Sequence, residues 1–90
     1  MDLNSIKESI VEHVYHIPKG KKVPLHKHDR LDEIFYCIKG SGFGVSEEGE
    51  VELSVGDTFV AAAGTMHSLR SDEDLYVCAI LVPVVDSRSQ

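Results

Sequence analysis

The chain has 90 residues, which is enough for one hydrophobic core and therefore one domain. Its apolar fraction of 42% excludes a disordered chain, and its formal charge of −6 disfavours nucleic acid as a partner, because phosphate binding needs a cationic surface. The longest apolar stretch, over 75–85, is interrupted by a proline and is too short to span a bilayer. We therefore expect a single domain over 1–90, with no nucleic-acid partner and no membrane segment.

The N-terminus is polar and no apolar run follows it, so we expect no secretory signal. The two cysteines, Cys37 and Cys78, are too few for a disulfide framework. A cytoplasmic protein with free thiols is the simplest interpretation of these features.

In chain order, residues 1–8 are expected to form a short helix or a loose arm, and residues 86–90 a frayed tail. Between them, short β-branched runs alternate with glycine, proline and acidic turns, which is typical of an antiparallel sandwich or barrel. We expect strands near 10–17, 22–28, 33–39, 42–46, 50–54, 57–61, 67–71 and 75–82. About eight short strands in a chain of this length predict an all-β, antiparallel jelly-roll barrel.

Four residues form a candidate metal site. His26 and His28 are two apart, so a strand over 22–28 would place both side chains on one face. Glu33 opens the next strand, and an antiparallel return can bring it beside the histidines. His67 follows a glycine turn much later, and a barrel can deliver it to the same interior point. Three imidazoles and one carboxylate suit one divalent transition metal (Fe, Mn, Ni, Zn or Cu), with coordination positions left open.

Two segments resemble the two motifs of the cupin superfamily. The first consists of Gly20, His26, His28, Glu33 and Gly40, with five, one, four and six residues in the gaps. The second consists of Gly56, Gly64 and His67, and it departs from the family pattern at Ala62, where proline is usual, and at Ser71, where asparagine is usual. Neither departure is at a metal ligand of the family pattern. The resemblance implies a small, single-domain cupin with its ion inside the barrel.

A period of two from Glu33 puts Phe35 and Cys37 on the inward face, where they would line the pocket near the metal. For Cys37 we favour a buried structural thiol over a reactive one. Met66, next to His67, is interpreted as a pocket or core filler rather than a copper ligand.

The same alternation turns Ile34, Tyr36 and Ile38 outward. An exposed apolar stripe indicates either a subunit interface or packing of a neighbouring segment of the same chain. The resemblance to cupins favours the first, a homodimer.

Other charged and imidazole side chains lie outside the motifs. His13 and His16 are assigned to the surface or to strand packing, although either can reach the pocket as an acid or base. A run of basic residues is interpreted as a solvated loop, or else as a cationic rim that favours a carboxylate-bearing substrate: Lys19, Lys21, Lys22, Lys27 and Arg30, with Arg70 as a further candidate.

Three functions remain open at this stage. The leading hypothesis is a metalloenzyme acting on a small organic molecule, dioxygenase-like and with iron as the first choice, in which Glu33 is a ligand that also accepts a proton. Similar cupins include isomerases, decarboxylases and lyases. The second hypothesis is a non-catalytic module that binds or senses a small ligand, and the third is a metal with a purely structural role.

Overall fold

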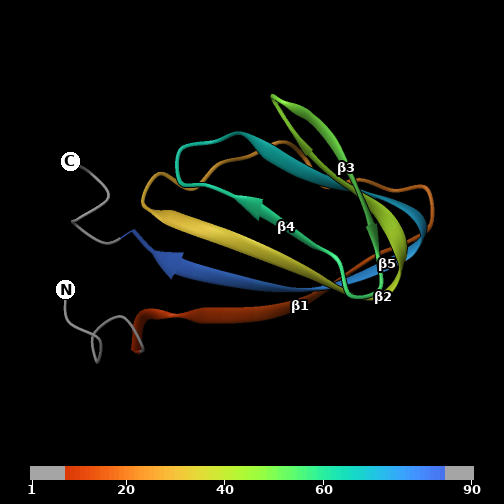
Figure 1. The fold of residues 1–90 in the computed structure, drawn as a ribbon, viewed down its shortest axis with the longest axis horizontal. Helices are drawn as coiled ribbons and strands as arrows, with labels where there is room; N and C mark the ends of the chain where they lie inside the picture. Colours follow the sequence, from red (N-terminus) through yellow and green to blue (C-terminus); the bar gives the residue numbers. More distant parts are fainter. Residues whose placement is uncertain (1–7, 85–90) are drawn as a thin grey trace.

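The structure is a computed structural model that describes residues 8–84, so the expected tail over 86–90 and all but the last residue of the expected arm over 1–8 lie outside the described residues. The regular secondary structure of the described part is almost entirely β-strand, and all of its strand pairs are antiparallel (Figure 1). The strands are β1 (Val11–Ile17), β2 (Leu31–Ser46), β3 (Gly49–Ser54), β4 (Thr58–Ala61) and β5 (His67–Pro83). The expected all-β antiparallel fold is confirmed. No helix within 8–84 is both long enough and apolar enough to cross a membrane.

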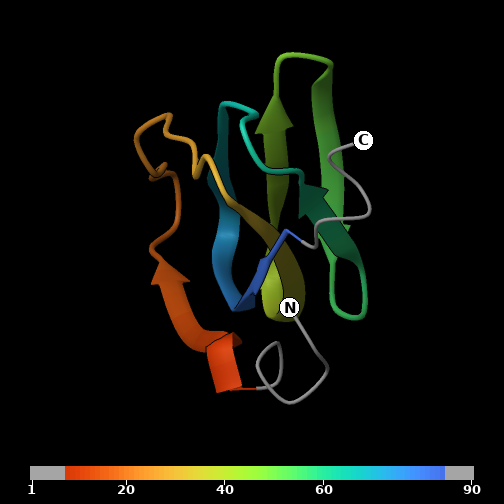
Figure 2. The same cartoon turned by 90° about the vertical axis from the view of Figure 1, so that its left-hand side faces the viewer.

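Two long strands form the centre of the fold. β2 and β5 pair along nearly their whole lengths, from Leu31 opposite Pro83 to Ser46 opposite His67. Near one end of this ribbon β1 pairs with β5 and β4 pairs with β2, whereas at the other end β3 pairs with β2. Figures 1 and 2 show how the ribbon curves, so that the β3 hairpin and the β1–β5–β2–β4 part form the two sides of an open barrel.

The described residues contain five strands rather than the eight expected. The expected turns at 39–42 and 71–74 are bulges inside β2 and β5, with register shifts between Cys37 and Gly42. Gly40 has a φ of 79°, and a Cβ there would lie 1.8 Å from the carbonyl oxygen of Asp74. Asp74 is itself in the left-handed region, with a φ of 37°. The ribbon bends here without breaking, because glycine allows the two backbones to approach closely.

The strand expected over 22–28 is also absent. The segment 21–26 runs antiparallel beside the first half of β5, but it forms only two isolated bridges, Lys22 with Arg70 and His26 with His67. Pro24 lies between them, and it has no N–H to donate to a continuous ladder. This segment closes one side of the barrel as an extended loop.

The inward and outward faces of the main sheet follow the predicted alternation. Glu33, Phe35 and Cys37 are buried, whereas Tyr36 and Ile38 are exposed and Ile34 is half-buried. The core contains these inward side chains and those of the neighbouring strands, namely Ile17, Leu53, Phe59, Ala61, Leu69, Leu75, Val77 and Ala79. This core fills one part of the barrel and leaves the part nearest Glu33 for the site.

Candidate metal centre

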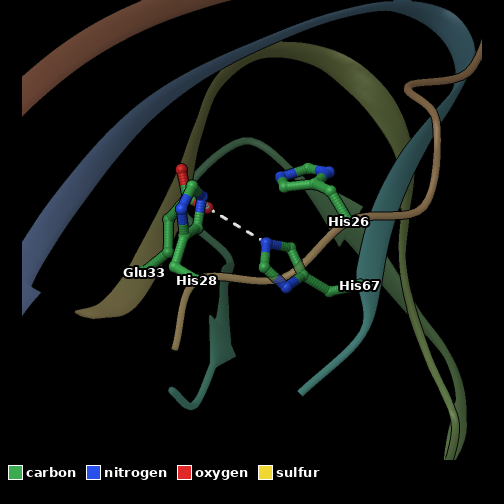
Figure 3. A group of neighbouring side chains, drawn as sticks. All are labelled: His26, His28, Glu33 and His67. Atoms are coloured by element: carbon green, nitrogen blue, oxygen red, sulfur yellow. Dashed lines mark hydrogen bonds and ion pairs between the residues drawn. The ribbon is translucent and has the colours of Figure 1, made fainter. Parts of the chain in front are cut away.

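Four side chains from three parts of the chain converge in the barrel (Figure 3). His26 and His28 come from the loop between β1 and β2, Glu33 from β2, and His67 is the first residue of β5. One potential ligand atom from each lies within 4.8 Å of the others. These are the four residues that the sequence places in one site.

Backbone pairing fixes the histidines relative to one another. The N–H of His26 donates to the carbonyl of His67 at 3.0 Å, and the N–H of His67 donates to the carbonyl of His26 at 2.8 Å. Each imidazole is also tied by its own Nδ1, which lies 2.9 Å from the Pro24 carbonyl in His26 and 2.8 Å from the Thr65 carbonyl in His67. With Nδ1–H donating to a carbonyl, Nε2 becomes the nitrogen available to a metal.

Glu33 is the most constrained donor. Its residue is 3% exposed, and its Oε1 lies 3.0 Å from Nε2 of His67 and 3.3 Å from Nε2 of His28. A carboxylate is costly to bury unless a positive charge compensates it. The surrounding imidazoles supply that charge only when they are protonated, whereas a bound cation supplies it with the imidazoles neutral.

The donor set fits a divalent transition ion. Two ligands bonded at about 2.1 Å lie roughly 3.0–3.4 Å apart in octahedral or tetrahedral geometry and about 4.2 Å apart when trans. The two Nε2–Oε1 separations of 3.0 and 3.3 Å fall in the first range. Imidazole nitrogens with one carboxylate suit Fe, Mn, Ni, Zn or Cu rather than Mg or Ca. The cluster therefore has the donor chemistry that a divalent transition ion requires, and it does not select among these metals.

The loop before His67 is held by hydrogen bonds to Asp32 and His28. Asp32 Oδ1 accepts a hydrogen bond of 2.8 Å from the Ala63 N–H, and the Gly64 N–H donates to the His28 carbonyl at 2.8 Å. Asp32 is thus a positioning residue that the motif-based reasoning missed. It supports the loop in which Ala62 replaces the usual proline.

A cavity of about 300 Å³ adjoins the cluster and is lined by three of its members, His26, His28 and Glu33. His16 also lines the cavity. The rest of the wall is mostly apolar and consists of Tyr15, Ile17, Val23, Phe35, Leu69 and Leu81. Of these, only Phe35 was predicted as a pocket residue. Leu69 carried a usable signal, because it is two residues from His67 and so shares its face. The others reach the cavity through long-range strand pairing.

Two predicted pocket residues are not among those lining this cavity. Cys37 is fully buried, but it lies beyond Phe35 along β2, and its Sγ is 3.7 Å from the carbonyls of Lys39 and Gly40. Burial raises the pKa of the Cys37 thiol, which keeps it protonated, as a structural cysteine requires. Met66 is half-buried, and it precedes His67 in an extended segment where neighbouring side chains point to opposite faces.

The remaining histidines and basic residues lie around the barrel rather than in the cluster. His16 is bonded through Nε2 to Asp74 Oδ1 at 3.0 Å and stacks on the Tyr76 ring, and His13 lies beside Tyr15. Arg70 forms a two-pronged ion pair with Glu50, with distances of 2.7 and 2.8 Å. No lysine or arginine of the described residues lines the cavity next to the metal cluster.

A small antiparallel barrel that gathers three histidines and one glutamate around one interior point defines this chain as a β-barrel protein with a candidate metal centre. The family model of the Cupin domain matches residues 13–83, which cover all four donors, and the chain belongs to the cupin family.

Relatives of known name and structure extend this assignment. The chain is 34% identical to the quercetin 2,3-dioxygenase of Bacillus subtilis over 67 residues, which are 73% of this chain and 20% of that protein. It is 31% identical to the oxalate-binding protein of Thermotoga maritima over 68 residues, or 73% of this chain and 56% of that one. The structure of KdgF from Halomonas sp. superposes with a TM-score of 0.77 at 30% identity, over 88% of this chain and 74% of that one. The chain thus spans about half or less of the length of these curated relatives.

Proposed function

We propose that this protein is a metal-dependent enzyme acting on a small organic molecule, with a dioxygenase-type reaction on iron as the leading case. The observation that carries the proposal is the position of the donor cluster: four convergent donors beside a cavity of about 300 Å³, rather than sealed in the core. A structural metal needs no such space, because its ligand set is closed by protein groups. The relationship to a protein named quercetin 2,3-dioxygenase supports the reaction type.

In this proposal His26, His28 and His67 hold the ion as neutral Nε2 ligands, and Glu33 supplies the anionic ligand. The bound metal supplies Lewis-acid chemistry, polarising an oxygen of the substrate. Glu33 also acts as the proton acceptor, because its carboxylate is the only acidic group among the residues lining the described cavity. Its burial away from water strengthens its interaction with a substrate hydroxyl. The apolar wall binds the remainder of the substrate and excludes water from the reacting end.

The first experiment is a metal analysis by mass spectrometry on protein expressed in medium supplemented with the five candidate metals. We expect about one transition-metal ion per chain in the wild type and loss of that ion in His26→Ala. His13→Ala is the matched control, because His13 lies outside the cluster, and it should keep its metal. Wild-type protein without a stoichiometric transition metal would refute the proposal.

The second experiment separates catalysis from binding. Dioxygen uptake is measured with the metal-loaded protein across a panel of diketones, flavonols and catechols, and turnover of at least one compound is expected. Glu33→Gln should abolish turnover. Ligand binding without turnover across the panel would instead identify a non-catalytic binding or sensing module, for which the oxalate-binding relative is a precedent in name. A carboxylate-bearing ligand is the competing substrate class.

We further propose that two copies associate through the outward face of the β1–β5–β2–β4 part of the sheet. Apolar side chains on this face come from β1, β2 and β4 and include Val14 at 65% exposed, Tyr36 at 42%, Ile38 at 43% and Val60 at 59%. Glu12 and Thr58 lie on the same face, by their pairing with Ile80 and Tyr36. Ile34, Cys78 and Ile80 lie half-buried between them. A contiguous apolar sheet face of this kind is covered by a second copy in many small proteins.

A further inference from the structure

The wall of the metal cavity has one chemical character. Its aliphatic and aromatic members come from three strands and from the extended loop, and they include Ile17 at 5% and Leu69 at 3% exposed. Tyr15, at 42% exposed, is the one wall residue outside the metal cluster that combines a large aromatic ring with a hydroxyl. Away from the metal-binding end, a ligand that fills this cavity therefore contacts mostly apolar surface, with Tyr15 and His16 as the polar exceptions.

The basic residues of the nearby loop do not change this character. Lys19 Nζ lies 3.4 Å from a carboxylate oxygen of Glu73, and Lys27 Nζ lies 3.6 Å from one of Asp29. These ion pairs are exposed, and none of the basic residues from 19 to 30 lines the cavity. Among the described wall residues outside the metal cluster, His16 is the one side chain that can carry a positive charge, and its Nε2 is already paired with Asp74 Oδ1 at 3.0 Å. The described wall thus offers no unpaired cation to an anionic ligand.

A charge count then limits what the cavity can hold. A divalent ion, three neutral imidazoles and the Glu33 carboxylate sum to a net charge of about +1. A chelator that loses one proton brings the buried assembly to zero. A dianion such as oxalate leaves a net charge of −1 against an apolar wall, where an uncompensated charge is strongly disfavoured.

We propose that the ligand of this site is an uncharged, largely apolar molecule with two neighbouring oxygens, which chelates with loss of a single proton. Catechols, α-hydroxyketones, enediols and β-dicarbonyls belong to this class, and dicarboxylates do not. The proposal rests on the proposed metal centre and names the substrate class for it. A cavity of about 300 Å³ is roughly twice the ~150 Å³ that accommodates benzene, so an apolar part of one to two rings fits.

The test compares chelators of matched geometry on the cobalt-loaded protein. Acetylacetone and malonate form the same six-membered chelate, and tropolone and oxalate both form five-membered ones. Only the second member of each pair binds as a dianion. Binding is followed by the visible spectrum of Co²⁺ and by calorimetry, and each affinity is divided by the affinity of the same chelator for Co²⁺ in buffer. We expect this ratio to be at least tenfold higher for acetylacetone and tropolone.

The outcomes are distinct. Protein that does not take up Co²⁺ or another transition metal refutes the proposed function and the inference with it. If Co²⁺ binds and the ratio for oxalate or malonate equals or exceeds that of its partner, or if no chelator changes the spectrum, the substrate class is wrong while the metal centre stands.

A charge-insertion variant tests the physical reason directly. Tyr15→Arg places a cation at the exposed edge of the wall, and we expect it to raise the affinity for malonate and oxalate at least fivefold relative to their partners. Val55→Arg adds the same charge at a site 64% exposed in the β3–β4 turn, away from the cavity, and should leave the preference unchanged. Equal preferences in the two variants would refute the charge argument, and the wild-type comparison stands if Tyr15→Arg does not fold.

Discussion

Replacing Asp32 by alanine should weaken metal binding without removing a ligand. Asp32 Oδ1 accepts a hydrogen bond of 2.8 Å from the Ala63 N–H, in the loop that leads to His67. The same loop provides the Thr65 carbonyl, 2.8 Å from His67 Nδ1, which orients the ring. In Asp32→Ala the loop loses this hydrogen bond and is less ordered in the metal-free protein. Metal binding must then order the loop and His67, and this entropy cost lowers the metal affinity.

The size of the effect follows from the bond that is lost. A hydrogen bond to a charged group contributes about 1.5–3 kcal/mol, and about 1.4 kcal/mol is a factor of ten in an equilibrium constant. Part of this free energy is lost as stability of the metal-free fold, and only the remainder weakens metal binding. We therefore expect the Kd for the metal to rise by about 10-fold, with about 100-fold as an upper bound, which is the range found for outer residues of metal sites.

The assay is a competition titration against a chromophoric chelator, with thermal melting of the metal-free protein alongside it. Asp57→Ala is the matched control, because Asp57 Oδ2 accepts a hydrogen bond of 2.9 Å from the Ser54 N–H in the β3–β4 turn. Both variants should lower the melting temperature, but only Asp32→Ala should change the Kd by more than twofold. Equal metal affinities in the two variants would show that the loop is positioned without Asp32.

Three further predictions concern packing, assembly and pH. Gly44→Ala should destabilise the fold by about 1–3 kcal/mol in urea titration, because its Cβ would lie 2.3–2.6 Å from ring atoms of Phe59, and Phe59→Leu in the same chain should restore part of the loss. Ile38→Glu should convert a dimer to a monomer in light scattering, whereas Val55→Glu, at a site 64% exposed, should not; an unchanged mass for Ile38→Glu would locate any interface elsewhere. The hydrogen bond from His16 lowers the pKa of Asp74 below its ordinary 3.8. The ionised Asp74 carboxylate therefore stabilises the folded state above that pH, and this contribution is lost as pH falls through the lowered pKa. The difference in urea midpoint between wild type and Asp74→Asn should accordingly shrink from pH 7 towards pH 2, and a pH-independent difference would contradict this.

The four side chains that the sequence places in one site do converge, whereas the local structure predicted for two of them is wrong. His26 and His28 were placed on one face of a strand, yet the segment around them is a loop with two isolated bridges and a proline between. Both residues reach the site because His26 pairs with the backbone of His67, a contact between residues far apart in the sequence. Motif spacing records the outcome of such long-range pairing, whereas strand periodicity describes only neighbours.

The number of strands was predicted wrongly because local composition does not show whether a turn-like segment ends a strand. Glycines at 40 and 42 and the acidic run over 71–74 have the composition of turns, and local reasoning places turns there. In the structure these residues lie opposite each other, with the Gly40 backbone against the Asp74 carbonyl, so both chains bend together and pairing continues. Nothing in either segment alone distinguishes a turn from a paired bulge, because the distinction depends on the partner strand.

Glu33 connects the stability of this small barrel with its proposed chemistry. It is 3% exposed, adjacent to two imidazole nitrogens, and at the junction of a packed core with a cavity. A hydrophobic residue at this position would extend the core and stabilise the metal-free chain, since a buried carboxylate is costly without a compensating charge. The chain instead places a carboxylate where only a cation or a proton can balance it, and it leaves apolar space beside it. In the proposed metal centre a divalent ion would offset that cost and leave one unit of positive charge beside a mostly apolar wall. Glu33 would then make the barrel depend on its metal and also set the charge of the ligand that the site accepts.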